Sequence, residues 1–390
     1  MCTDVLLTQS SANAVRYVCV AFRNGKRIFA CVTSLPPQLP NSRNCSKHLL
    51  NWYKVMIPKS YRKLVIKNFN SDFRSAVEIV ETELQKPQTN EILIKNQFAG
   101  INAGFDTLLS QDKIPYLNPK IPIDMGVEVV GNVVAIGDNV KQFKTGDRVL
   151  TFTKGGAYRE YQTVSIDGVI KVPEVSPEIL TLVPTGVSAL VALEQVGEMT
   201  SQEVVLVTAA AGGTGHIAVQ LAKLAGNHVI GTCGSPKKVE LLQQLGCDRV
   251  INYRQENVNE VLKKEYPQGI NLVFECVGGK MFDTCVDNLA MMGRLVVVGF
   301  ISEYSHNLEQ INQPRIYHQL FWKAASVRAF LMPCYREYQA EASDRLFNLF
   351  QTKQLKVAIE PTEFRGLDSI VEAVEYQLSG KNQGKVIVRL

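Results

Sequence analysis

The sequence Glu203-Val-Val-Leu-Val-Thr-Ala-Ala-Ala-Gly-Gly-Thr-Gly-His-Ile-Ala218 decides the fold. Its apolar run 204–207 predicts a buried strand, and apolar residues at helical spacing over 217–224 predict a helix. The glycine turn between them, Ala210-x-Gly212-x-x-Gly215, brings backbone N–H groups to the positive end of that helix, which suits a pyrophosphate. Because Ala210 replaces the first glycine of the G-x-G-x-x-G signature, a tight turn in another parallel-sheet protein is the alternative.

The segment after a second predicted strand, 228–232, indicates which dinucleotide binds. It reads Gly231-Thr-Cys-Gly-Ser-Pro-Lys-Lys238 and contains no acidic residue. Units that bind NAD usually place an acid here, where it bonds the ribose 2′-OH. Ser235 and Lys238 instead offer a hydroxyl and an ammonium where a 2′-phosphate would lie. A solvated helix N-terminus is the alternative, but cations are disfavoured there. The segment therefore favours NADPH over NADH.

Length and composition predict an enzyme of two domains. The chain has 390 residues, of which 46% are hydrophobic and 20% charged, ordinary values for globular proteins. No uninterrupted apolar run reaches the roughly 18 residues of a membrane span, so no integral membrane segment is expected. The nine cysteines form no CxxC pair, which favours free thiols in a reducing compartment.

The net charge of +5 comes from the first 57 residues, which hold seven Lys and Arg against the single acid Asp4. Residues 58–390 are near neutral, so no nucleic-acid partner is expected. The segment 1–57 is rich in serine and poor in acids, as transit peptides are. A disordered leader, or a true start near Met56, is the alternative. These readings predict a mitochondrial or cytoplasmic protein.

The strand pattern divides the remainder of the chain. Residues 58–185 predict a barrel-like β domain, because the short strand-like runs 61–66, 91–98, 128–136, 147–151 and 157–164 alternate with turn signals. Strands and helices alternate over 186–329, which predicts a doubly wound parallel sheet with ligands at the carboxyl ends of its strands. The tail 330–390 shows one helix-like stretch, 366–378, and a closing strand, 385–390.

Several motifs in order resemble those of the medium-chain dehydrogenase/reductases. The barrel carries Gly126-x-Glu128, Gly131-x-Val133 and Gly146-Asp147-x-Val149. Ala209–Gly215 and Leu245-Gly-Cys-Asp-x-Val-Ile-Asn-Tyr253 are similar to the quinone-oxidoreductase and enoyl-reductase branch, and Gly299-Phe-Ile-Ser302 and Gly380-Lys-Asn-x-Gly-Lys385 to its prostaglandin reductases. The resemblance covers about 58–390. It implies a GroES-like catalytic domain before and after a Rossmann domain, a homodimer, and a peroxisomal location as a further possibility.

The barrel segment argues against a metal. Residues 58–185 contain no cysteine and no histidine, although zinc sites draw mainly on Cys, His and carboxylates. Zinc-dependent members of the resembling family carry Cys where this chain has Asn102 and His where it has Val127. Without a metal to polarise an alcohol, simple alcohol dehydrogenation is not expected.

The resemblance implies that NADPH reduces a carbon–carbon double bond next to a ketone, in a small-molecule enone or an oxidised lipid. Asn102 would be the active-site polar residue, with a turn-forming role before Ala103-Gly104 as the alternative. Tyr116 would line the mouth, with packing in a proline-rich loop as the alternative. Glu128 is expected to be structural and to bond backbone inside the barrel.

Further cofactor contacts are implied by the same resemblance. They are the turn residues Gly212, Gly213, Thr214 and Gly215, with Thr185 on the nicotinamide side; Ser235, Lys238 and Tyr253 at the 2′-phosphate; Cys276, Val298, Gly299, Phe300 and Tyr304 as walls; and Phe330 and Asn382 from the tail. Two other classes stay open. One is a quinone oxidoreductase on the same fold, and the other is a non-catalytic NADPH-binding protein that handles lipids.

Overall fold

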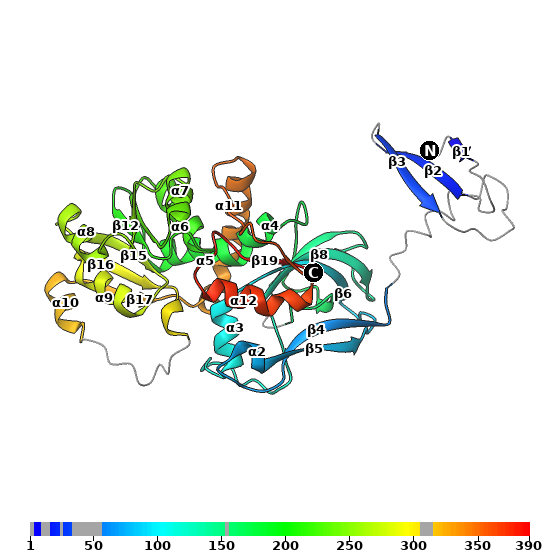
Figure 1. The fold of residues 1–390 in the computed structure, drawn as a ribbon, viewed down its shortest axis with the longest axis horizontal. Helices are drawn as coiled ribbons and strands as arrows, with labels where there is room; N and C mark the ends of the chain where they lie inside the picture. The colour runs from blue at the N-terminus through cyan, green and yellow to red at the C-terminus, as the bar shows by residue number, and fades with distance from the viewer. Residues whose placement is uncertain (1–3, 9–15, 24–25, 33–56, 153–155, 305–314) are drawn as a thin grey trace. The chain divides into compact units, whose positions relative to one another are not determined.

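The computed structural model describes residues 4–8, 16–23, 26–32, 57–152, 156–304 and 315–390 (Figure 1). Contacts divide the chain into two units, Met1–Ile57 and Pro58–Leu390. In the first unit an antiparallel sheet has the order β1-β2-β3, formed by β1 (Asp4–Thr8), β2 (Arg16–Arg23) and β3 (Lys26–Val32). Much of the predicted leader lies outside the described residues, and its role stays a prediction.

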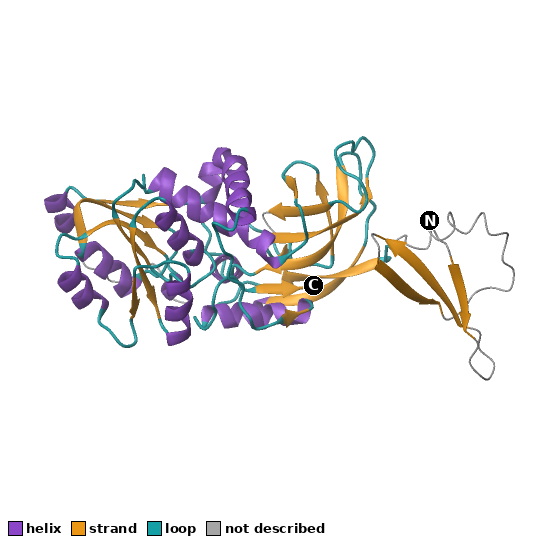
Figure 2. Cartoon of the chain, turned by 90° about the horizontal axis from the view of Figure 1, so that it is seen from above, coloured by secondary structure: helices purple, strands orange, loops and turns teal. Residues whose placement is uncertain are grey.

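The parallel sheet predicted around the glycine turn is confirmed. Its order is β14-β13-β12-β15-β16-β17, and every neighbouring pair is parallel. Numbered along the chain this is the 3-2-1-4-5-6 order of a Rossmann domain. Helices cover both of its faces (Figure 2). The strands are β12 (Val204–Val207), β13 (His228–Cys233), β14 (Arg249–Asn252), β15 (Ile270–Glu275), β16 (Leu289–Val297) and β17 (Ser326–Ala329); the helices are α6 (Gly215–Leu224), α7 (Pro236–Gln244), α8 (Val258–Glu265), α9 (Gly279–Asp287) and α10 (Tyr317–Lys323).

The barrel-like domain is confirmed as well. A seven-stranded sheet has the order β11-β9-β8-β6-β19-β18, with β10 also pairing β6, and a three-stranded sheet has the order β5-β4-β7. Strand β5 and the short strands β7 and β11 were not expected from the sequence. The elements are β4 (Ser60–Ile66), α2 (Phe73–Ala76), β5 (Val77–Glu83), β6 (Glu91–Gly100), α3 (Ala103–Ser110), β7 (Ile123–Asp124), β8 (Glu128–Ile136), β9 (Arg148–Phe152), β10 (Tyr161–Ser165) and β11 (Val169–Lys171).

A continuous helical stretch, 177–196, follows the barrel and contains the predicted domain limit at 185/186. It comprises α4 (Pro177–Thr181), η2 (Leu182–Gly186), α5 (Val187–Val191) and η3 (Ala192–Val196), of which η2 and η3 have the wider π geometry. Among the described helices this stretch alone has the length and hydropathy to cross a membrane, yet 83% of its most apolar window is buried inside the fold. It packs as a core helix of the Pro58–Leu390 unit.

The tail returns to the barrel, as expected. Its strand β19 (Ile387–Arg389) pairs antiparallel with β6 and parallel with β18 (Phe364–Arg365). The expectation of a single helix in the tail is wrong, because α11 (Gln339–Gln351) precedes η7 (Leu367–Ser369) and α12 (Ile370–Leu378). The start of α11 carries no capping residue, since its N-cap position is Tyr338. Two short helices also precede it, η4 (Ile301–Glu303) and η6 (Met332–Tyr338).

Candidate functional site

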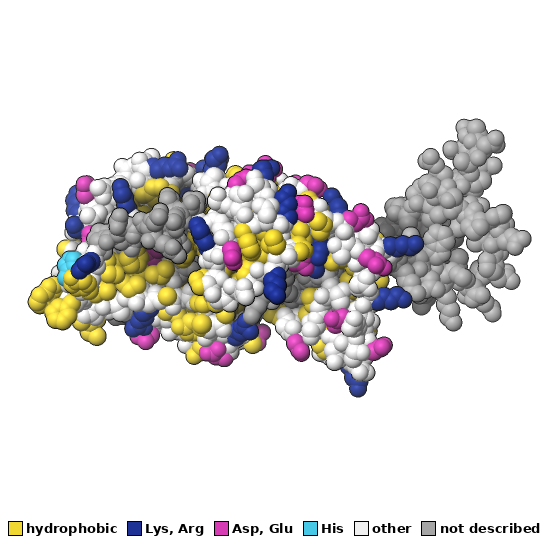
Figure 3. Space-filling view, turned by 90° about the horizontal axis from the view of Figure 1, so that it is seen from below, with side chains coloured by type: hydrophobic (Ala, Val, Ile, Leu, Met, Phe, Trp, Pro, Cys, Tyr) yellow, Lys and Arg dark blue, Asp and Glu magenta, His cyan; other side chains and the backbone are white. Residues whose placement is uncertain are grey.

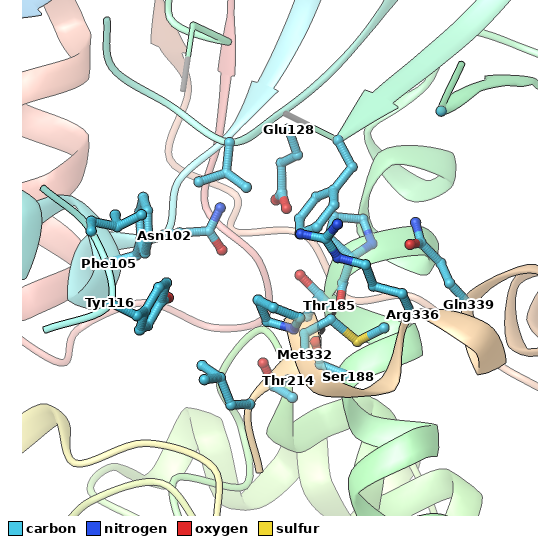
Figure 4. Close-up of a pocket in the computed structure, with 17 residues that line it drawn as sticks. Asn102, Phe105, Tyr116, Glu128, Thr185, Ser188, Thr214, Met332, Arg336 and Gln339 are labelled. Carbon is cyan, nitrogen blue, oxygen red and sulfur yellow. Dashed lines mark hydrogen bonds between the residues drawn. The ribbon is translucent and has the colours of Figure 1, made fainter. Parts of the chain in front are cut away.

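An apolar cavity of about 550 Å³ lies where the barrel, the 177–196 helix and the tail meet (Figure 4). Asn102 enters it from the end of β6, where it is the N-cap residue of α3. Thr214 enters from the glycine turn, and Arg336 from η6. The described residues that line it are Asn102, Phe105, Tyr116, Leu117, Val127, Glu128, Phe152, Gly168, Pro184, Thr185, Ser188, Thr214, Leu331, Met332, Pro333, Arg336 and Gln339.

Lys385 holds the polar end of this cavity. Its Nζ lies 2.6 Å from Glu128 Oε1 and donates to Asn102 Oδ1 at 2.9 Å. The side chains of Lys385 and Glu128 are only 4% and 1% exposed. The expectation that Glu128 bonds backbone is therefore wrong: its carboxylate lines the cavity and is neutralised by an ammonium from the tail. With Oδ1 of Asn102 engaged, its Nδ2 is the donor: one N–H makes a long contact of 3.5 Å with the Gly100 carbonyl, and the second N–H is left to donate.

A second buried contact supports the start of α3. The Tyr158 hydroxyl donates to Asp106 Oδ2 at 2.6 Å, and both residues are fully buried. Burial raises the pKa of Asp106 to about 7 and raises the pKa of Tyr158 well above its usual value. The Asp106 N–H donates to the Asn102 carbonyl at 3.0 Å. This contact fixes the backbone from which the Asn102 side chain projects.

Pro184 explains how Thr185 reaches the cavity. Proline has no N–H for the helix ladder, and a helix widens where that ladder is interrupted. The π segment Leu182–Gly186 contains this proline. Thr185 is 6% exposed and lines the cavity, while the Ser188 hydroxyl donates to the Pro184 carbonyl at 2.7 Å.

The glycine turn borders a second cavity of about 450 Å³. Gly215 allows the close packing of the turn, since a Cβ there would lie 2.5 Å from the Ala209 carbonyl oxygen. The N-cap residue Thr214 makes no side-chain cap, which leaves the first turn of α6 open to an anion. The described lining residues are Ala209, Ala211, Gly212, Gly213, Thr214, Gly215, Thr232, Cys233, Gly234, Lys238, Tyr253, Cys276, Val277, Met281, Ile301, Ser302, Gln377, Leu378, Gly380 and Asn382.

The end of β13 is built as the sequence indicated, without a carboxylate. Lys238 lines the second cavity, and its Nζ donates to the Gly380 carbonyl at 2.7 Å. Burial lowers the pKa of Lys238, which an anion beside it would counter. Tyr253 crosses directly over Gly234, where a Cβ would lie 2.4 Å from the Tyr253 hydroxyl oxygen. A larger residue at 234 would displace that ring.

The two cavities share Thr214. Of the predicted residues, Asn102, Tyr116 and Thr185 line the first, and Tyr116 is 54% exposed there. The second brings together Gly212, Gly213, Gly215, Lys238, Tyr253, Cys276 and Asn382. The remaining predicted residues line neither cavity: Ser235, Val298, Gly299, Phe300, Tyr304 and Phe330. Tyr304 instead packs on α3, where a Cβ on Gly104 would lie 2.3 Å from its ring.

Comparisons with known proteins agree with this architecture. The alcohol dehydrogenase GroES-like domain family matches residues 88–174, and the zinc-binding dehydrogenase family matches 213–362. Prostaglandin reductase-3 from Mus musculus is 40% identical, over 88% of this chain and 93% of its own length. A probable quinone oxidoreductase from Leishmania amazonensis is 36% identical, over 85% and 99%. A solved structure of Escherichia coli quinone oxidoreductase with NADPH has a TM-score of 0.74 and 28% identity, over 84% and 100%.

The chain belongs to the medium-chain dehydrogenase/reductases, in their quinone-oxidoreductase branch. Within the described residues, no group of three or more His, Cys, Asp and Glu side chains could hold a metal ion. Among the described residues that line the apolar cavity, the one carboxylate is that of Glu128, and it already pairs with Lys385.

Two residues at the apolar cavity of this medium-chain reductase, Lys385 and Arg336, were not predicted from the sequence. Lys385 stands at the entrance to a buried strand, and a buried lysine needs a partner, so the signal was present in Gly384-Lys-Val-Ile-Val388. Its partners are not readable, because Asn102 lies 283 residues away along the chain. Arg336 gave no signal, since it lies in a polar segment of the tail without strong periodicity.

Proposed function

We propose that this chain is an NADPH-dependent, zinc-independent reductase of the carbon–carbon double bond of α,β-unsaturated ketones, similar to a 15-oxoprostaglandin 13-reductase. One observation carries the proposal. The glycine-turn cavity and the apolar cavity meet at Thr214. A dinucleotide with its pyrophosphate at the turn would therefore place its nicotinamide at the cavity that contains Asn102.

The phosphate end supports NADP(H) rather than NAD(H). No acid follows β13, and Lys238 and Tyr253 line the cavity there. An ammonium attracts a 2′-phosphate that a carboxylate would repel. The related Escherichia coli quinone oxidoreductase was solved with NADPH. Gly212, Gly213 and Gly215 would let the pyrophosphate approach the backbone.

The nicotinamide, when bound, would supply the hydride to the β carbon of the enone, and the α carbon of the resulting enolate would take a proton to give the saturated ketone. The protein has to orient the enone, stabilise negative charge on its oxygen and exclude water. Because Lys385 donates to Asn102 Oδ1, the Nδ2 group of Asn102 is the one that would donate to the enone oxygen. The Lys385 ammonium lies directly behind the amide and favours the same charge. The cavity lining is mainly apolar, with Phe105 and Met332 among its residues, and would limit the water beside a bound enone.

The cavity lining does not fit zinc. It offers one carboxylate, no imidazole and no thiol among the described residues, whereas zinc in proteins takes mainly Cys, His and carboxylate ligands. The carboxylate of Glu128 is already held by an ammonium at 2.6 Å. Activity should therefore survive EDTA or phenanthroline, and elemental analysis should find no stoichiometric zinc. One tightly bound zinc per chain would overturn this part of the proposal.

A quinone oxidoreductase is the second candidate, because two of the relatives carry that name. A quinone presents the same conjugated carbonyl to the same cavity, so the panel of substrates decides between the two. The test is NADPH oxidation with 15-oxoprostaglandins, other enones and quinones, followed by mass spectrometry and NMR of the products. A saturated ketone supports the proposal, and an allylic alcohol rejects it. NADPH binding without turnover of any compound would favour a non-catalytic lipid-handling protein.

A homodimer is part of the proposal. Strand β17 lies at the edge of its sheet and pairs only with β16 among the described strands. Exposed apolar side chains from the preceding segments lie on the surface, among them Met292, Phe321 and Trp322 at 72%, 74% and 76% exposure. Figure 3 shows hydrophobic side chains gathered at the end of the Pro58–Leu390 unit that carries α10. Light scattering coupled to size exclusion should give twice the monomer mass, and a monomer would reject it.

A further inference from the structure

The apolar cavity contains one uncompensated charge among its described residues. Of the described lining residues, Glu128 and Arg336 alone carry a formal charge at neutral pH, and Glu128 is neutralised by Lys385. The Arg336 guanidinium makes no hydrogen bond or ion pair with any described residue. By contrast, Arg345 on the neighbouring helix α11 pairs with Glu194 at 2.8 Å. Within the described part of the chain, the cavity therefore presents one cation without a partner.

Arg336 lies across the cavity from the reacting end, which contains Asn102. Figure 4 shows its guanidinium directed into the cavity, on the side opposite Asn102, Phe105 and Tyr116. Gln339, the first residue of α11, lies beside Arg336 on that side. Apolar residues, among them Phe152, Pro184 and Met332, make up most of the rest of the described lining. A ligand that fills the cavity would have a polar group at each end and an apolar body.

The chemistry of the second polar end selects a carboxylate. A guanidinium presents its N–H groups as a planar fork that matches both oxygens of a carboxylate. The Gln339 amide can add one further donor. A cavity of about 550 Å³ is within the range that holds an extended small molecule. An apolar chain with a carboxylate at its end would use all of these features.

We propose that Arg336 binds the carboxylate of the substrate, so that the enzyme prefers enones whose apolar chain ends in a free acid. The identity of the reacting end rests on the proposed function. The carboxylate site itself does not, because a saturated acid without an enone would also occupy it. Binding at Arg336 would fix how far the enone reaches toward Asn102, which makes Arg336 a determinant of specificity.

The test compares acids with their methyl esters, on the full-length enzyme with NADPH. An oxo-octadecenoic acid with a mid-chain enone should show a kcat/KM about tenfold above that of its methyl ester. Arg336→Gln should abolish that preference, with the loss mainly in KM. The expected preference is only about tenfold because salt screens an exposed guanidinium, so its contact with a carboxylate has an energy at the low end of the range for charged groups. Arg336→Lys should restore part of the preference. Arg345→Gln removes the same charge outside the cavity and should leave it unchanged.

A second measurement works without turnover. Calorimetric titration of the NADP complex with dodecanoate should show binding that methyl dodecanoate lacks and that Arg336→Gln weakens about tenfold. If acid and ester are reduced equally well by the wild-type enzyme, the enone reductase stands and the carboxylate site is rejected. If no enone is reduced but dodecanoate still depends on Arg336, the carboxylate site stands and the proposed function fails. Equal losses for acid and ester in Arg336→Gln would mean that the side chain only shapes the cavity.

Discussion

The Lys385 ammonium lies 2.6 Å from Glu128 Oε1, and the two side chains are 4% and 1% exposed. This pair joins the segment just before the last strand, β19, to the start of β8 in the barrel, at the wall of the apolar cavity. Taking both charges out of water is costly unless they are paired and hydrogen-bonded. The third partner, Asn102 Oδ1 at 2.9 Å, provides that bond, so the ion pair and the candidate catalytic amide are held together.

Breaking this pair should destabilise the protein. Lys385→Met leaves a buried carboxylate without its cation and should lower the free energy of unfolding by about 3–5 kcal/mol. The double change Lys385→Met with Glu128→Gln removes both charges and should recover much of that loss. Urea unfolding followed by circular dichroism at pH 7 measures both.

Arg74→Met is the control. It breaks the exposed Arg74–Glu375 pair and should lower the free energy of unfolding by less than about 1 kcal/mol. Equal losses in the single and the double variant would contradict a charge-based role.

Asn102 can be tested with its contact to Lys385 kept. Asn102→Asp retains an oxygen that accepts from Lys385 but removes the N–H donor. We expect kcat for enone reduction to fall by about 10²–10³, as for the loss of one oxyanion donor, with the KM for NADPH unchanged. A ribose hydroxyl of the cofactor could share the load and reduce the loss. Asn102→Ala should show a similar decrease.

Steady-state kinetics and product analysis decide the role of Asn102. A saturated ketone formed at full rate by Asn102→Asp or Asn102→Ala would leave the reaction in place and remove Asn102 from it. A rise in the KM for NADPH with kcat preserved would move Asn102 to cofactor binding.

The sequence predicted the parts of the site that lie on regular elements. Apolar runs ending in glycine located β12 and β13, and the lack of an acid after β13 singled out Lys238, which lines the glycine-turn cavity. The strand order follows because a parallel sheet with one strand per helix has few topologies. The residues of the glycine turn are adjacent in sequence, so their contact with one ligand follows from local geometry alone.

The rest of the site depends on contacts between distant segments. Lys385 meets Asn102 across 283 residues, and no period or spacing records such a pairing. Arg336 lies in η6, whose helical residues are interrupted by non-helical backbone at Tyr335. Glu128 was misread because a carboxylate inside a barrel can bond either backbone or a cation, and the tail that supplies the cation is far away in the sequence.

His216 should make stability depend on pH. Burial lowers its pKa to about 4, while its Nδ1 donates to the Gly212 carbonyl at 2.9 Å and its Nε2 accepts from the Ala358 N–H. Because this folded-state pKa lies below the unfolded value of about 6.5, the unfolded chain binds more protons between them. The contribution is therefore complete above pH of about 6.5 and is lost as the pH falls toward about 4.

The effect of His216 on the free energy of unfolding has to be measured as a difference between wild type and a variant, because protonation of Asp106 changes that free energy in the opposite direction. Its pKa is raised to about 7, so its protonation stabilises the fold as the pH falls through that value. The difference in free energy of unfolding between wild type and His216→Asn should decrease by about 2 kcal/mol from pH 7 to pH 5. A constant difference for His216→Asn would contradict the assignment.

Lys238 should decide the choice of cofactor. Its ammonium lines the glycine-turn cavity, donates to the Gly380 carbonyl and has no carboxylate partner among the described residues. Lys238→Ala should raise the KM for NADPH by about tenfold to a hundredfold, because a hydrogen bond to a charged group contributes about 1.5–3 kcal/mol. The KM for NADH should stay nearly constant, since NADH has no 2′-phosphate.

The neighbouring residue provides the control. Lys237 is exposed and does not line the cavity, so Lys237→Ala removes the same charge from the same helix and should change the KM for NADPH much less. Lys238→Arg keeps the cation and should preserve the preference for NADPH over NADH, even if the fit is poorer. Initial rates with both cofactors at a fixed enone concentration measure all three variants. Equal effects of Lys238→Ala on NADPH and NADH would place Lys238 in the support of the Gly380 loop and remove it from phosphate recognition.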